Sequence, residues 1–269
     1  LFLSIILILP IVGIITKIEF DFFYVIKFFE SKYNFKLIYI SFLQAFLSSL
    51  ISCLIAIPLA LSLNRQKHIK FIKIVILLCG YAFVMPSILV IYAVIGIFGI
   101  NGILNLSLNF YDFFNIKSLF GLKAIILAHI LLNTPFAARL FFQNLHSIPK
   151  SYVDEIKSLR LGFWGNIIAI EIPILKQNFF SIFSIIFVLC FLSFAIVMTL
   201  GGGPSTSNLE VAIYQAAIFE MNFNKAVILS CLQILICIIF LIIGFYKLRG
   251  SNYFKSQYTF TKHHYSQPI

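Results

Sequence analysis

Charged residues are scarce in this chain. Asp, Glu, Lys and Arg make up 11% of the 269 residues, while 61% are hydrophobic. A soluble domain of ordinary composition is about 25% charged and about 45–50% apolar. So few charges do not cover the surface of a water-soluble protein of this size, which excludes a soluble enzyme, and so much apolar material excludes a disordered chain. The composition therefore indicates a membrane protein with several spans.

Patterns of reactive groups are missing as well. The five cysteines form no CxxC pair, and the five histidines show no metal-ligand spacing with the nine acidic residues. A Walker A motif is absent, so the chain by itself is not expected to hydrolyse ATP. We therefore expect no catalytic residues, no metal and no cofactor, and we disfavour the alternative of an integral membrane enzyme.

Long apolar runs are what the sequence does contain. Five of them are long enough to cross a bilayer as tilted helices: Phe35–Leu63, Ile74–Ile97, Leu119–Leu145, Phe179–Leu200 and Ala226–Tyr246. A shorter run, Leu1–Thr16, lacks the basic start and cleavage site of a signal peptide, and we interpret it as part of a first span. Continuous runs disfavour a β-barrel, so we predict an all-α integral membrane bundle of about six transmembrane helices.

The distribution of basic residues predicts the orientation of these spans. Six spans put both termini on one side, together with the loops at 64–73 and 139–176, and that side carries 13 of the 20 Lys and Arg residues. The positive-inside rule then places the termini and both loops in the cytoplasm. The same rule explains the net charge of +11, so we expect no nucleic-acid partner. It also leaves Glu210 among the residues outside the membrane.

Several residues inside the predicted spans are unusual for a bilayer. Pro58, Pro86 and Pro135 are expected to kink three of the helices. His129 and Asn133 are four residues apart and therefore share one helix face. Two interpretations stay open for this pair: hydrogen bonds between helices, or the lining of a polar translocation pathway.

The loop between the fourth and fifth spans has a pattern of its own. Ser151 and Asp154 resemble a helix-capping box, and apolar residues then recur on one face of a short helix outside the bilayer: Tyr152, Ile156, Leu159 and Phe163. Such a face either packs under its own bundle or lies in a groove on a partner protein.

This loop resembles the conserved "EAA" loop of permease subunits from bacterial ABC importers. Aligned on Trp164 and Pro173, Asp154 takes the Glu position, Glu155 and Ile156 take the two Ala positions, and Arg160 replaces the usual Gly, with Gly162 two residues later. The resemblance implies a coupling helix that docks on an ATPase subunit. Its expected docking residues are Tyr152, Asp154, Glu155, Ile156, Leu159, Arg160, Gly162 and Phe163.

A second segment resembles the permeases of thiamine importers. Leu200 is followed by Gly201, Gly202, Gly203 and Pro204, a turn expected to end the fifth span at the periplasmic face. The segment Glu210–Gln215, which follows a cap expected at Ser207, matches the Glu-x-Ala-Ile-Tyr-Gln segment of those permeases, and so do the residues from Asn133 to Leu140. The resemblance adds Tyr214 and Gln215 to His129 and Asn133 as expected pathway residues.

The two resemblances together imply a fold and a function. The fold is a type I ABC importer permease (MetI-like) bundle over residues 1–247, with a polar cytoplasmic tail over 248–269. The chain is expected to lie in the bacterial inner membrane as a multi-pass permease subunit that imports thiamine or a related small solute. An iron(III) importer permease is the alternative. The implied partners, besides the lipid bilayer, are an ABC ATPase dimer, a periplasmic solute-binding protein, and a second permease half or a second copy of the chain.

Overall fold

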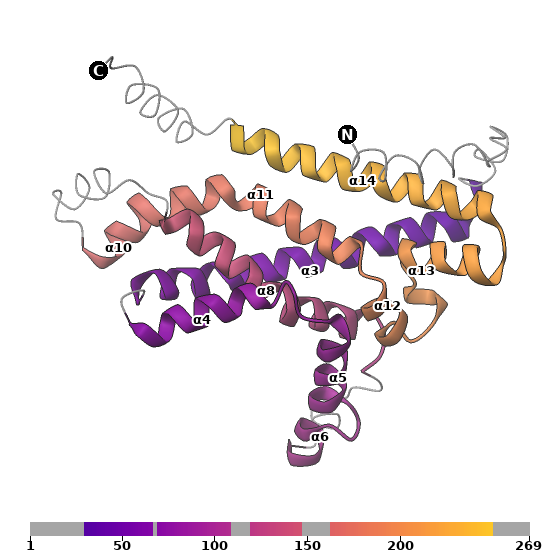
Figure 1. Ribbon diagram of the computed structural model, residues 1–269, viewed down its shortest axis with the longest axis horizontal. Helices are drawn as coiled ribbons and strands as arrows, with labels where there is room; N and C mark the ends of the chain where they lie inside the picture. The colour runs from indigo at the N-terminus through magenta and orange to yellow at the C-terminus, as the bar shows by residue number, and fades with distance from the viewer. Residues whose placement is uncertain (1–29, 67–68, 109–118, 147–161, 250–269) are drawn as a thin grey trace, which may run out of the picture.

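Figure 1 shows the computed structural model of the chain, which describes residues 30–66, 69–108, 119–146 and 162–249. Regular secondary structure in these residues is helical throughout. In chain order the elements are α3 (Lys32–Arg65), α4 (Lys70–Tyr81), α5 (Ser87–Phe98), α6 (Ile103–Leu108), α8 (Leu122–His146), α10 (Phe163–Asn166), the π-helix η1 (Ile167–Glu171), α11 (Ile172–Phe191), α12 (Ala195–Leu200), the 3₁₀-helix η2 (Pro204–Thr206), α13 (Leu209–Tyr214), the π-helix η3 (Gln215–Phe219) and α14 (Phe223–Arg249).

Five segments of the described chain are long and apolar enough to cross a membrane. They are Lys32–Arg65, Ser87–Ser107, Leu122–His146, Ile172–Phe191 and Phe223–Tyr246. The predicted all-α class is confirmed, and α3, α8 and α14 begin and end within three residues of the predicted spans. The predicted first run, Leu1–Thr16, lies outside the described residues.

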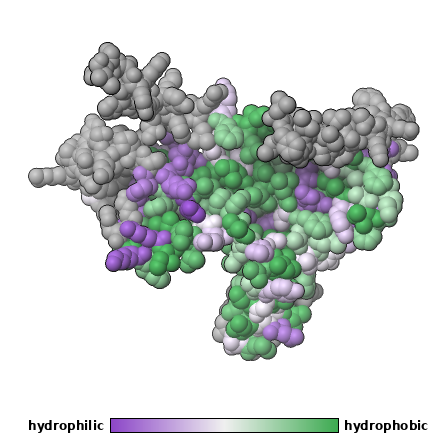
Figure 2. Space-filling model, viewed as in Figure 1, coloured by the Kyte–Doolittle hydropathy of each residue, from purple (hydrophilic) through white to green (hydrophobic). Residues whose placement is uncertain are grey.

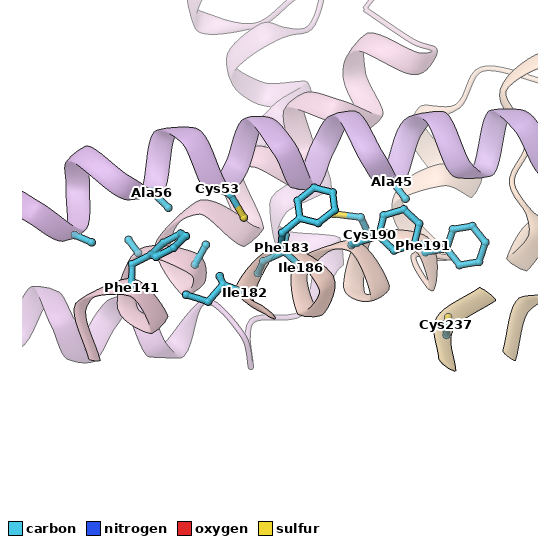
Figure 3. Packing of buried hydrophobic residues seen from close by; sticks show 14 of the residues in the cluster. Ala45, Cys53, Ala56, Phe141, Ile182, Phe183, Ile186, Cys190, Phe191 and Cys237 are labelled. Carbon is cyan, nitrogen blue, oxygen red and sulfur yellow. The ribbon is translucent and has the colours of Figure 1, made fainter. Parts of the chain in front are cut away.

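The core of the bundle lies where α8 and α11 pack against α3. Figure 3 shows Phe141 of α8 and Phe183 of α11 directed toward α3, whose facing residues Ala45, Cys53 and Ala56 are small and completely buried. Small residues let two membrane helices approach closely, and van der Waals packing is what holds such helices together in lipid. The other side of α11 packs on α14.

The predicted helix over Ile74–Ile97 is wrong in one respect. The run forms two helices, because α4 ends at Tyr81 and α5 begins at Ser87, directly after Pro86. Proline has no N–H to donate and restricts the residue before it, so Pro86 ends a helix here and does not merely kink one. α5 and α6 then project away from the other helices (Figure 1). Pro58 and Pro135, in contrast, lie inside continuous helices as predicted.

The predicted span Phe179–Leu200 is also divided. α11 ends at Phe191, and a separate short helix, α12, covers Ala195–Leu200. The intervening residues include neither Gly nor Pro. The backbone carbonyl of Ser193 instead accepts a hydrogen bond from Asn208 Nδ2 at 2.9 Å, so a residue fifteen positions later stabilises the break.

The described helix ends that flank the basic segments predicted to be cytoplasmic lie at one end of the bundle. α3, α8 and α14 end there and α10 begins there (Figure 1), and Arg65 Nη2 lies 3.0 Å from Glu171 Oε2 in an ion pair. Hydrophilic side chains are concentrated toward this end, while the middle of the visible face is apolar (Figure 2). The basic stretch counted from residue 139 begins inside α8, which continues to His146, one residue beyond the predicted span.

Candidate translocation site

Polar side chains along α3 form a buried seam with α8 and α11, which we call the α3–α8 seam: Ser41, Gln44, Ser48, Ser49, Ser52, His129 and Asn133. His129 Nδ1 lies 3.2 Å from Ser48 Oγ, and Asn133 Nδ2 lies 3.3 Å from Cys190 Sγ. Gln44 Nε2 donates to the carbonyl of Cys190 at 3.3 Å.

The two α8 residues predicted to line a pathway therefore lie inside this seam. Only 1% of His129 and 5% of Asn133 is exposed, and each contacts a neighbouring helix. These contacts suit hydrogen bonds between helices, the first of the two interpretations left open by the sequence. Nε2 of His129 has no partner among the described residues. A pathway role for the pair stays a prediction.

The glycine-rich turn connects α12 to the rest of the bundle. Gly202 and Gly203 have φ angles of +72° and +137°, a region that side chains with a Cβ rarely adopt. The carbonyl of Leu200 accepts a hydrogen bond from the N–H of Gly121 at 2.8 Å, which ties the turn to the start of α8. Pro204 then begins η2, whose Thr206 hydroxyl donates back to the carbonyl of Gly201.

The short helix α13 begins one residue later than the sequence suggested. Its cap is Asn208, whose Oδ1 accepts from the N–H of Val211 at 3.0 Å; Ser207 was the predicted cap. The N–H of Leu209 donates to Ser41 Oγ of α3 at 2.8 Å. Asn208 therefore has two functions, since its amide also holds the break after α11. These bonds fix α13 between α3 and α14.

The acidic side chain of Glu210 on α13 reaches the apolar middle part of α14. Glu210 Oε1 accepts from Gln233 Nε2 at 2.9 Å, and Gln233 is 3% exposed. The predicted topology placed Glu210 outside the membrane, and Glu210 was not among the predicted site residues. Sequence patterns do not show that Glu210 lies beside Gln233, because the two residues are 23 positions apart in the chain.

Aromatic rings surround the next turn of α13. The ring of Tyr214 lies 5.1 Å from that of Phe194 and 5.7 Å from that of Phe219, measured between centroids. Tyr214 is 37% exposed, and Gln215 is the first residue of η3. Single π-helical turns of this kind are frequent at functional sites. Of the four predicted pathway residues, Tyr214 and Gln215 are thus less buried than His129 and Asn133.

The predicted coupling helix is only partly described. Tyr152, Asp154, Glu155, Ile156, Leu159 and Arg160 lie outside the described residues. Gly162 is exposed, and Phe163 begins α10 immediately after it. Trp164 on α10 is 72% exposed at the end of the bundle that carries the Arg65–Glu171 ion pair. Among the described residues, no group of three His, Cys, Asp or Glu is placed to hold a metal ion.

Several curated proteins with similar sequences are thiamine permeases. The thiamine transport system permease protein ThiP of Haemophilus influenzae is 38% identical over 211 residues, which cover 78% of this chain and 39% of that protein. ThiP of Escherichia coli is 32% identical over 209 residues, with the same coverage of both chains. The chain thus spans about two fifths of the length of these relatives. No protein-family model matches it.

Solved structures with a similar fold include ABC transporters. A chain of a bacterial alginate ABC transporter, in complex with its periplasmic protein, aligns with a TM-score of 0.68 over 90% of this chain and 88% of that one, at 16% identity. A chain of the inward-facing MetNI methionine ABC transporter aligns with a TM-score of 0.60 over 82% of this chain and 98% of that one, at 13% identity. The predicted fold, an ABC importer permease bundle, is confirmed.

Proposed function

Because this chain is a relative of the thiamine transport permeases and has the fold of ABC importer permeases, we propose that it forms one permease half of an importer for thiamine. The observation that carries the proposal is the 38% identity over 211 residues to a thiamine permease. The long apolar helices provide the membrane bundle, and the polar and aromatic residues around α13 provide groups that a hydrated solute requires inside it.

Transport of labelled thiamine tests this proposal directly. Cells that lack the gene and have no other thiamine importer should take up little labelled thiamine, and a plasmid-borne copy of the complete gene should restore uptake. Labelled iron(III) supplied to the same cells serves as the control cargo, because the alternative assigns an iron importer. Normal thiamine uptake without the gene, or restored uptake of iron alone, would contradict the proposal.

We propose further that a separate ATPase drives transport through the segment Tyr152–Phe163. The apolar stripe of this predicted helix supports the assignment, because such a face suits a groove on a partner. So does the position of α10, which follows the segment directly and lies at the end of the bundle where Arg65 pairs with Glu171. Closure of the ATPase dimer on ATP would move this helix and rock the bundle between its two open states.

Substitution of the stripe tests the docking. Ile156→Asp with Leu159→Asp places two charges in the proposed interface and should abolish co-purification with the ATPase. The matched control is Lys157→Asp, which lies between them on the other face of the predicted helix and should leave co-purification unchanged. Retention of the ATPase by the double variant would show that the stripe packs under its own bundle instead.

The remaining proposed partners are a second permease bundle and a periplasmic binding protein. A pathway wide enough for thiamine requires a second bundle, either in the same polypeptide or in a second copy of this chain. A periplasmic binding protein would deliver thiamine to the face opposite the ATPase, in the bacterial inner membrane, with the termini in the cytoplasm. A reporter fused next to Lys150 should be active on the cytoplasmic side only.

A further inference from the structure

Glu210 is an acidic residue placed against the middle of a membrane span. Its partner Gln233 is on α14, where no charged residue occurs between Lys225 and Lys247. At 1.5 Å per residue, Gln233 lies about 12 Å along the helix from Lys225 and about 21 Å from Lys247. The carboxylate is therefore held well inside the apolar segment and not at its end.

No cation neutralises this carboxylate within the described part of the chain. The two ion pairs found there are Arg65–Glu171 and Lys225–Glu220, and Glu210 takes part in neither. Gln233 is its hydrogen-bond donor among the described residues, and an amide donor supports a carboxylate without cancelling its charge. Ionisable residues within membrane spans are costly, and those that occur usually mark substrate or ion pathways.

The same helix face carries an aromatic surface. Tyr214 follows Glu210 by four residues, so the two side chains are neighbours on α13, roughly 5–6 Å apart at their Cβ atoms. Both are less buried than Val211 and Ala212 between them, which belong to the packed side of the helix. The rings of Phe194 and Phe219 lie next to that of Tyr214 and extend the ring surface.

A carboxylate beside aromatic rings is a combination that recognises organic cations. The carboxylate supplies the opposite charge, and the ring faces attract a cation through their quadrupoles and stack on a flat heterocycle. We infer that Glu210 and Tyr214 form an intramembrane binding site for the positively charged, aromatic ring of the transported solute. This inference rests on the proposed function, since thiamine is a cation with such a ring.

The site also predicts a preference among related solutes. A fixed negative charge in a low-dielectric setting attracts the positively charged ring of thiamine and repels the negative charges of a phosphate ester. Thiamine should therefore be preferred over thiamine diphosphate. An uncharged isostere of thiamine, with a thiophene in place of the thiazolium ring, should gain nothing from the carboxylate.

The test measures transport by the complete importer, with its ATPase and binding protein, in proteoliposomes. Glu210→Gln keeps the shape and the bond to Gln233 but removes the charge, and it should lower thiamine uptake at least about tenfold, a change of about 1.4 kcal/mol. Uptake of the thiophene isostere by the same variant should stay at the wild-type level. Glu210→Asp, which keeps the charge, should retain most thiamine uptake.

Glu220→Gln is the matched control, because Glu220 is an acidic residue from the same region that is already paired with Lys225. It should transport both solutes as the wild type does. Basal ATP hydrolysis, measured in every variant, reports whether the complex has assembled.

Three results would overturn the inference. Wild-type thiamine uptake by Glu210→Gln would show that the charge has no part in recognition. An equal loss of thiamine and of the thiophene isostere would show that Glu210 only holds α13 against α14. A wild-type importer that transports no thiamine would remove the proposed function, and this site assignment with it.

Discussion

The α3–α8 seam and the α13 site both place polar side chains inside the membrane bundle, yet they differ in how these groups are satisfied. In the seam, neutral side chains such as Ser48 and His129 contact one another across a closely packed helix pair. At α13, a charged residue has one amide donor and a partly exposed aromatic surface beside it. Under the proposed function, we expect polarity in the first region to serve helix packing and polarity in the second to meet the solute.

Overpacking the apolar helix contact next to the α3–α8 seam should have the largest effect. Ala56 of α3 is completely buried in the apolar cluster that α3 forms with α8 and α11, so Ala56→Leu adds atoms where no space is available. We expect the free energy of unfolding to fall by about 1–3 kcal/mol. Thermal unfolding of the purified protein in detergent measures this. Leu54→Ile on the exposed side of α3 is the control, and equal melting temperatures for all three proteins would show that the helix contact at Ala56 is loosely packed.

Removal of the aromatic ring at the α13 site should affect transport and not stability. Tyr214→Ala should raise the KM for thiamine about fivefold, which corresponds to about 1 kcal/mol of lost ring–cation attraction. Tyr214→Phe keeps the ring and should stay within about twofold of the wild type. The measurement is the concentration dependence of uptake. If Phe and Ala raised the KM equally, the hydroxyl and not the ring would be the important group.

Disturbing the contact between α11 and α14 should change the free energy of unfolding by a similar amount. A Cβ added at Gly244 would lie 2.8 Å from Ser184 Oγ and 2.9 Å from Ser184 Cβ, so Gly244→Ala should separate the helices and cost about 1 kcal/mol. Gly96 of α5 has open space at the same point, and Gly96→Ala should stabilise the protein by about 0.5–1 kcal/mol through helix propensity alone. Melting temperatures that shift in the same direction for both variants would contradict this packing.

Deletion of a single seam hydroxyl should have the smallest effect. Ser48→Ala removes the partner of His129 Nδ1, and hydrogen bonds between membrane helices are worth about 0.6 kcal/mol on average. We expect a small drop in melting temperature and an unchanged KM for thiamine. A clear rise in KM would instead place His129 on the pathway, as one interpretation of the sequence suggests, and would remove the distinction between the two regions.

Much of the fold was predictable because the bilayer imposes strict requirements on sequence. A helix that crosses it needs about 20 apolar residues, and the runs that became α3, α8 and α14 satisfy this with charges at their ends. Pro86 was recognised as a disturbance, but its strength was underestimated, since a kink and a helix end have the same local signal. The loop at 147–161, on which the coupling helix was predicted, lies outside the described residues.

The sequence by itself determined that this chain is an apolar helical bundle and where α3, α8 and α14 begin and end to within three residues, because hydrophobic length is a local property. Only the tertiary structure decided that α11 stops at Phe191, since the break is stabilised by Asn208 from a later turn. It likewise decided that Glu210 lies beside Gln233 inside the span. Both outcomes depend on hydrogen bonds between residues far apart in the chain, and periodicity and composition carry no information about such partners.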